Sequence, residues 1–174
     1  MTPLDLLRRR GADTLEHPGG TLLAHLERVS ERLDSYGAPP DLVAAGLLHA
    51  AYSTDAFDQA LLTLDERPLL VSLIGPGAEE LVYRYAATDR VPFFRQLGQP
   101  LVVWTDRFTK RGVTLDPPDV APLVELTVAN ELDILEHLAV EPSGTLRALL
   151  TRARPHMSEA AWADVTRSLD PQLR

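Results

Sequence analysis

Apolar residues recur at helical spacing along most of this chain, and the pattern predicts an all-α fold. Between Thr21 and Tyr36 they follow one another every three or four residues, which is typical of a helix with one buried face. The next helix, expected over residues 41–51, is apolar on every side except at Asp41 and His49. A helix of that kind is normally enclosed by others, so we expect it to be the most buried element of the fold.

Caps and helix breakers set the bounds of the remaining elements. Glycine and proline predict a loop over residues 16–20 and a break at residues 75–77, and residues 89–100 show no periodicity. The only β-like stretch is 101–115, which predicts a small hairpin. Further helices are expected at residues 3–10, 55–64, 68–74, 78–88, 116–138, 145–154 and 159–169.

Composition indicates one acidic, cytoplasmic domain. The 174 residues are 45% hydrophobic, which is enough for a single domain over residues 1–174. The net charge of −8 disfavours nucleic acid as a partner, because phosphate binding requires clustered cations. The absence of cysteine excludes disulfides and sulfur-ligated zinc. No apolar run approaches the roughly 20 residues of a membrane span, and the first residues lack the apolar core of a signal peptide, so no membrane partner is expected.

Two histidines stand out because each interrupts an apolar helical segment. His25 lies at the edge of the buried face of the first segment, and His49 lies near the end of the second, 24 residues later. This spacing places one imidazole on each of two neighbouring helices. Either histidine alone is typical of a satisfied core residue, whereas the pair indicates a shared site. Ring centres more than about 10 Å apart would exclude a shared ligand.

Further polar residues fall at positions where they could complete such a site. Asn130, Asp133 and His137 are spaced i, i+3 and i+7, so they share one side of the helix predicted over 116–138. Burying Asp133 without a partner would be costly, so we expect it to face polar groups. His17 precedes Pro18 and two glycines, which would hold it close to the start of the next helix.

The block that begins at Thr21 resembles the start of the HD superfamily, all-helical metal-dependent phosphohydrolases whose first ligand histidine lies on one helix and whose His-Asp pair ends the next. It reads TLLAHLERVSERLDSYGAPPDLVAAGLLHAAYST. The later run Val128–Asp133 is similar to the segment that carries the final metal-binding Asp in that family. The resemblance, which extends over residues 14–138, implies an HD-like helical bundle. The whole pattern is similar to short bacterial HD-like proteins without an assigned activity.

Both carboxylates of the HD pattern are replaced in this chain. Ala50 stands where the Asp of the His-Asp pair is expected, and Asn130 stands where the late Asp is expected. Ser53 and Thr54 follow where the related guanosine tetraphosphate hydrolases carry an acidic pair. A two-metal phosphohydrolase needs acids to hold its cations, so the chain is not expected to be a typical one.

The candidate site is therefore rich in imidazole. The catalytic candidates are His17, His25, His49 and Asp133, of which His25, His49 and Asp133 are also candidate ligands of a single Fe, Mn or Zn ion. A metal-free acid–base site is the alternative. The substrate-binding candidates are Asn130, Tyr52, Thr54 and Arg107, although Thr54 could equally cap a helix and Arg107 could pair with Asp106.

These residues favour a small-molecule enzyme on a degenerate HD-like scaffold, acting on a small polar substrate. One alternative is an HD-type non-haem iron oxygenase, because a nitrogen-rich ligand set suits iron. Another is a non-catalytic module that binds a small ligand in the same pocket. Assembly into a homodimer is left open. The metal content of the purified protein would separate these hypotheses.

Overall fold

The computed structural model describes residues 1–99, 101–138 and 141–169, and these residues confirm the all-α fold with small hairpins. They form two compact units by their internal contacts, Met1–Ala87 and Thr88–Arg174, called unit 1 and unit 2 below. Each unit is described by itself, and the single domain expected over 1–174 stays a prediction. No helix in the described part of the chain is long and apolar enough to cross a membrane.

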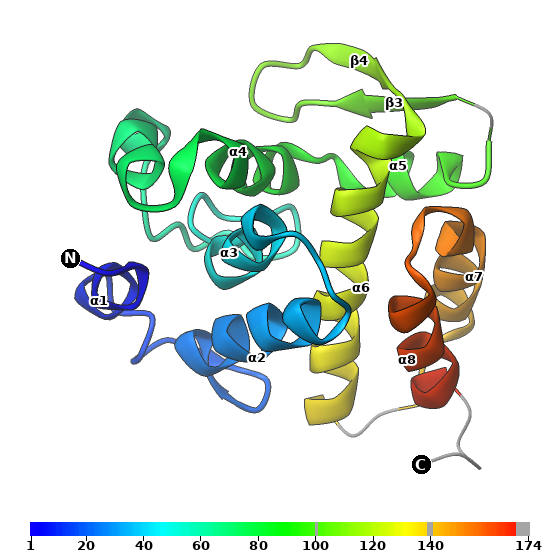
Figure 1. The fold of residues 1–174 in the computed structure, drawn as a ribbon, viewed down its shortest axis with the longest axis horizontal. Helices are drawn as coiled ribbons and strands as arrows, with labels where there is room; N and C mark the ends of the chain where they lie inside the picture. Colours follow the sequence, from blue (N-terminus) through cyan, green and yellow to red (C-terminus); the bar gives the residue numbers. More distant parts are fainter. Residues whose placement is uncertain (100, 139–140, 170–174) are drawn as a thin grey trace. The chain divides into compact units, whose positions relative to one another are not determined.

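Unit 1 is built around three helices that lie next to one another, α2 (Leu22–Ser35), α3 (Pro40–Leu48) and α4 (Arg67–Ala87) (Figure 1). The close approach of α3 to α2 depends on Gly46. A Cβ at that position would lie 2.5 Å from Leu33 Cδ1 and 3.3 Å from Ser30 Cα. The hydroxyl of Ser30 also donates a 2.9 Å hydrogen bond to the carbonyl oxygen of Val43. The two helices predicted to carry His25 and His49 are therefore in direct contact.

The start of unit 1 follows its local sequence signals. Helix α1 (Pro3–Arg9) begins at a capping box, in which Thr2 and Asp5 bond each other's backbone N–H groups. The loop expected at residues 16–20 is instead a short hairpin of β1 (Glu16–His17) and β2 (Gly20–Thr21). Two residues a strand are too few to leave an alternating pattern in the sequence.

The segment between α3 and α4 differs from the prediction. No helix forms over residues 55–64, where the chain instead makes a bridge between Thr54 and Phe57 and a short 3₁₀ turn, η1 (Leu64–Glu66). The hydroxyl of Thr54 accepts the N–H of Phe57, so it closes a local turn rather than capping a helix. The predicted break at residues 75–77 is a kink inside α4, where Gly75 takes φ 83° and ψ 163°.

Unit 2 contains the predicted hairpin, formed by β3 (Val102–Thr105) and β4 (Gly112–Leu115), and the helices α6 (Pro117–Leu138), α7 (Gly144–Ala153) and α8 (Glu159–Leu169). A 3₁₀ turn, η2 (Arg154–His156), joins α7 to α8. Helix α5 (Arg90–Gln96) lies where no element was expected. It is seven residues long and buries only Phe93, so it has too few apolar positions to show a helical period.

The helix expected over residues 41–51 ends at Leu48, and seven of the eleven residues in that range are buried. In α3, Asp41 is exposed and Val43, Ala44 and Leu47 are only partly buried. In α6, every residue from Leu123 to Asn130 is buried. Over its whole length α6 buries twelve of its 22 residues, so residues 41–51 have the larger buried share of the two segments.

Candidate histidine site in unit 1

Three histidines from three different elements of unit 1 lie in contact. His17 is on β1, His25 is on α2, and His49 is the residue that ends α3. The ring centroids of His25 and His49 are 5.2 Å apart with planes at 78°, and those of His17 and His25 are 4.1 Å apart in a stacked pair. The predicted proximity of the His25 and His49 rings is confirmed. Only 1% of His25 and 2% of His49 is exposed, so both imidazoles are withdrawn from water.

Local contacts hold His17 over the start of α2. The guanidinium of Arg28 donates to the carbonyl oxygens of Pro18 and Gly19 in the turn between β1 and β2. Thr21 then caps α2 by accepting the N–H of Ala24. Because Arg28 lies on the same helix as His25, the turn that carries His17 is tied to the helix that carries its stacking partner.

The orientation of His49 is set by the backbone of α3. Its Nδ1 lies 2.8 Å from the carbonyl oxygen of Gly46. A carbonyl oxygen can only accept, so Nδ1 carries the proton, and in the neutral ring Nε2 is then the basic nitrogen. Nε2 is the atom that can take a proton from another group.

Two aromatic side chains extend the histidine cluster at its ends. The ring of Tyr85, from α4, meets His49 edge to face at 5.4 Å, and Phe57 meets His17 in the same way at 5.9 Å. Such edge-to-face contacts favour one ring orientation over others. Neither residue could be predicted from the sequence, because neither has a regular spacing to the histidines.

The ring contacts differ between the two histidine pairs: His17 and His25 are stacked, whereas His25 and His49, the expected metal-ligand pair, meet edge to face. Within the part of the chain that the structure describes, no group of three or more His, Cys, Asp or Glu side chains could hold a metal ion. The single Fe, Mn or Zn ion expected from the sequence, with His25, His49 and Asp133 as its ligands, stays a prediction.

The remaining predicted site residues on the late helix belong to unit 2. Asp133 is buried, with its carboxylate 3.6 Å from His137 Nδ1, the atom that also bonds the Asp133 carbonyl oxygen at 2.8 Å. Asn130 donates to Glu131, which in turn pairs with Arg90. The polar stripe predicted for this helix therefore has local partners within unit 2.

Arg107 also belongs to unit 2, at the tip of the hairpin. Its guanidinium lies over the ring of Phe108, 4.3 Å from the centroid. The neighbouring carboxylate of Asp106 accepts the N–H groups of Phe108 and Thr109 and the hydroxyl of Thr109. Asp106 thus shapes the hairpin turn.

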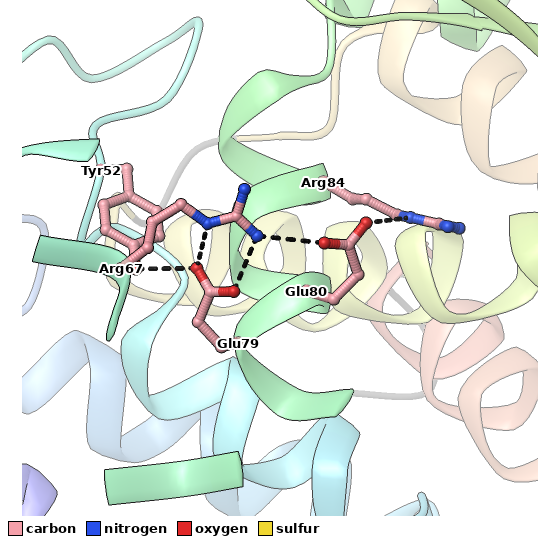
Figure 2. Close-up of polar contacts among 5 residues, drawn as sticks. All are labelled: Tyr52, Arg67, Glu79, Glu80 and Arg84. Atoms are coloured by element: carbon pink, nitrogen blue, oxygen red, sulfur yellow. Dashed lines mark hydrogen bonds and ion pairs between the residues drawn. The ribbon is translucent and has the colours of Figure 1, made fainter. Parts of the chain in front are cut away.

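Tyr52, predicted to line the pocket, instead joins a network of charged side chains in unit 1 (Figure 2). Its hydroxyl donates a 2.9 Å hydrogen bond to Glu79 Oε1. Arg67 donates two hydrogen bonds of 2.7 Å to the same carboxylate. It also donates one of 3.1 Å to Glu80, which accepts another from Arg84. Glu79 is 2% exposed, so this is a buried carboxylate with a full set of partners.

The network connects the histidine segment to both halves of α4. Arg67 precedes the kink at Gly75 and Glu79 follows it, so their pairing spans the bend in the helix. Tyr52 comes three residues after His49 in the chain. The Arg67–Glu79 pair could not be predicted from the sequence, because its partners are 12 residues apart across a break that no helical spacing connects.

Tyr52 is expected to ionise at an unusually high pH. Burial, followed by the hydrogen bond to Glu79, raises the pKa of Tyr52 above its ordinary value. As the pH rises past about 10, the unfolded chain loses this proton while the folded chain keeps it, so the stability that Tyr52 contributes below that pH is lost above it. In a titration followed by tyrosinate absorbance, Tyr52→Phe should remove a phenol that ionises well above about pH 10. A Tyr52→Phe variant with the same absorbance change in that range as the wild type would contradict this.

The fold and the histidine cluster define a helical protein with a buried imidazole pair in its N-terminal unit. Residues 6–90 match the model of a family described as a domain of unknown function, DUF6817. The matched residues nearly coincide with unit 1 and include all three clustered histidines. No curated protein and no solved structure matches the chain.

Proposed function

We propose that unit 1 carries the active site of a small-molecule enzyme in which His25 and His49 form a proton-transfer pair. The observation that supports this most strongly is the fixed tautomer of His49, whose Nδ1 proton is held by the Gly46 carbonyl oxygen. A buried imidazole with a defined basic nitrogen, beside a second buried imidazole, has the parts that general acid–base chemistry requires.

In this proposal His49 acts as the base and His25 as the acid. Nε2 of neutral His49 takes a proton from the substrate, and protonated His25 gives a proton to the atom that gains negative charge. The substrate then has the same number of protons, and the pair is restored when a proton passes from His49 to His25. Burial of both rings keeps water from competing for these protons. The stacked ring of His17 holds His25 in place, so His17 is a positioning residue.

The resemblance to HD proteins supports the place of the site but not their reaction. Ala50 is buried where an acid would be needed for a metal-bound phosphate. We therefore expect the protein to act on a small polar substrate without cleaving phosphate esters. Turnover of p-nitrophenyl phosphate above about 1 per second would contradict this part of the proposal.

The proton-transfer pair can be tested with the keto–enol tautomerisation of phenylpyruvate, in which one proton is removed from the substrate and another is added at a different atom. Wild-type protein should accelerate it, and His49→Ala should lower the rate by about 10²-fold or more, the usual contribution of a general base. His25→Ala should lower it comparably, whereas His137→Ala, outside the cluster, should not. Equal rates in the wild type and in both cluster variants, with unchanged melting temperatures, would refute the proposal.

A non-catalytic module that binds a small ligand is the second candidate. It is favoured by Ala50 and Asn130, which stand where the resemblance to HD proteins implies acids, because a site without those acids could still bind a ligand. Elemental analysis of protein purified without a histidine tag adds a further check. About one Fe, Mn or Zn per chain would overturn the metal-free proposal and favour the metal enzyme or the iron oxygenase.

A further inference from the structure

The two-stranded sheet of unit 2 has one covered edge and one open edge. At the edge of β3, the side-chain amide of Gln96 accepts the N–H of Val103 at 2.8 Å and donates to its carbonyl oxygen at 3.0 Å. The N–H of Asp89 donates to the carbonyl oxygen of Thr105 at 3.3 Å. Gln96 of α5 and Asp89, the residue that precedes α5, therefore make the hydrogen bonds with β3 that a third strand would otherwise make. Among the described residues, no strand pairs with β4 on its other side.

The register of the hairpin identifies which groups lie on the open edge. Val103 and Thr105 turn their backbone groups away from β4, and they lie opposite Thr114 and Gly112. In an antiparallel pair, the backbone groups of two opposite residues either both point toward the partner strand or both point away from it. The N–H and C=O groups of Thr114 and Gly112 therefore point away from β3. Both residues are exposed, as is Val113 between them.

We propose that this edge binds β4 of a second copy of the chain, to form a continuous four-stranded antiparallel sheet across a twofold axis at Val113. With Val113 opposite its own copy, Gly112 of each chain lies opposite Thr114 of the other. These are the two residues whose backbone groups point outward, so each of the two pairs forms two hydrogen bonds. The edge is therefore complementary to itself, which is what a twofold interface requires.

The side chains along the edge favour the same partner. Val113 is 52% exposed although it lies opposite the buried Trp104, so a second Val113 would extend the covered apolar face of the sheet. Lys110 and Arg111 precede the strand, and Asp116 follows it. Antiparallel pairing brings the basic end of one strand beside the acidic end of the other, which complements charge at both ends of the interface.

Substitutions at Thr114 separate edge pairing from folding. The N–H of Thr114 points away from β3, so Thr114→Pro removes an edge donor without removing a hydrogen bond of the hairpin. Thr114→Val keeps the donor and is the matched control. Val113→Lys provides an independent disruption, because it places two cations together at the axis.

Sedimentation velocity of the full chain, from about 5 to about 500 μM, measures the association directly. The wild type and Thr114→Val should shift from monomer to dimer as concentration rises, and Thr114→Pro and Val113→Lys should each weaken dimerisation at least about tenfold with unchanged circular dichroism. Lys110→Glu should weaken the dimer and reduce its dependence on salt. Wild-type protein that stays monomeric over the whole concentration range would overturn the proposal. That result is also the one expected if the edge binds a different protein. A dimer unaffected by Thr114→Pro and Val113→Lys would also overturn it.

Discussion

Arg67→Ala is expected to lower the free energy of unfolding of unit 1 by about 3–5 kcal/mol, because it leaves the buried carboxylate of Glu79 without its cation. Only 3% of the Glu79 side chain is exposed, and of the three hydrogen bonds to its carboxylate in Figure 2, Arg67 donates two and Tyr52 donates one. Water cannot replace those contacts without opening the fold. Urea denaturation followed by circular dichroism measures the loss.

Two variants calibrate this prediction. Arg84→Ala removes a cation that pairs with the half-exposed Glu80, and it should cost no more than about 1 kcal/mol. The double variant Arg67→Met with Glu79→Leu removes both charges, and it should be markedly more stable than Arg67→Ala. If Arg67→Ala cost no more than Arg84→Ala, Glu79 would have to be hydrated in solution, and the network of Figure 2 would be wrong.

Gly46→Leu is expected to have the second large effect and to prevent α3 from packing on α2. Even a Cβ at this position falls 2.5 Å from Leu33 Cδ1, and the backbone of Ser30 at 3.3 Å leaves little room for adjustment. Gly46→Ala should already cost about 1–3 kcal/mol, which for a domain of this size lowers the melting temperature by several degrees. Gly46→Leu should cost more, because the whole side chain must be accommodated.

Gly144→Ala is the matched control, because no atom lies within 4 Å of the Cβ that it would add at the start of α7. Alanine also favours helix more than glycine, so this variant should be neutral or slightly stabilising. A wild-type melting temperature in Gly46→Leu would contradict the close helix contact. The orientation of His49 would then also be in doubt, because the same residue supplies its carbonyl partner.

Sequence periodicity was a reliable guide where an element was long and had one buried face. Helix α2 agrees with its predicted bounds because Thr21 caps it and five apolar or aromatic positions mark its period. The same local signals failed at residues 53–64. Ser, Thr and Asp side chains bond nearby backbone groups in turns as readily as in helix caps, and Thr54 makes a turn with Phe57.

The histidine cluster could be predicted only in part. The contact between His25 and His49 followed from their positions on two neighbouring helices, and glycines beside His17 correctly placed it near the start of α2. The partners of the cluster could not be predicted in the same way. Tyr85, which contacts His49, and Glu79, which accepts from Tyr52, both lie in the part of α4 that follows the kink at Gly75. Such contacts depend on the angle of the kink, which no spacing in the sequence encodes.

The orientation of the His25–His49 pair can be tested most directly by long-range ¹H–¹⁵N correlation spectra of protein labelled at histidine. We expect that His49, in its neutral form, carries its proton on Nδ1, and that its ring protons show through-space contacts with those of His25. His49 protonated on Nε2 instead, or an absence of contacts between the two rings, would contradict the proposed proton-transfer pair.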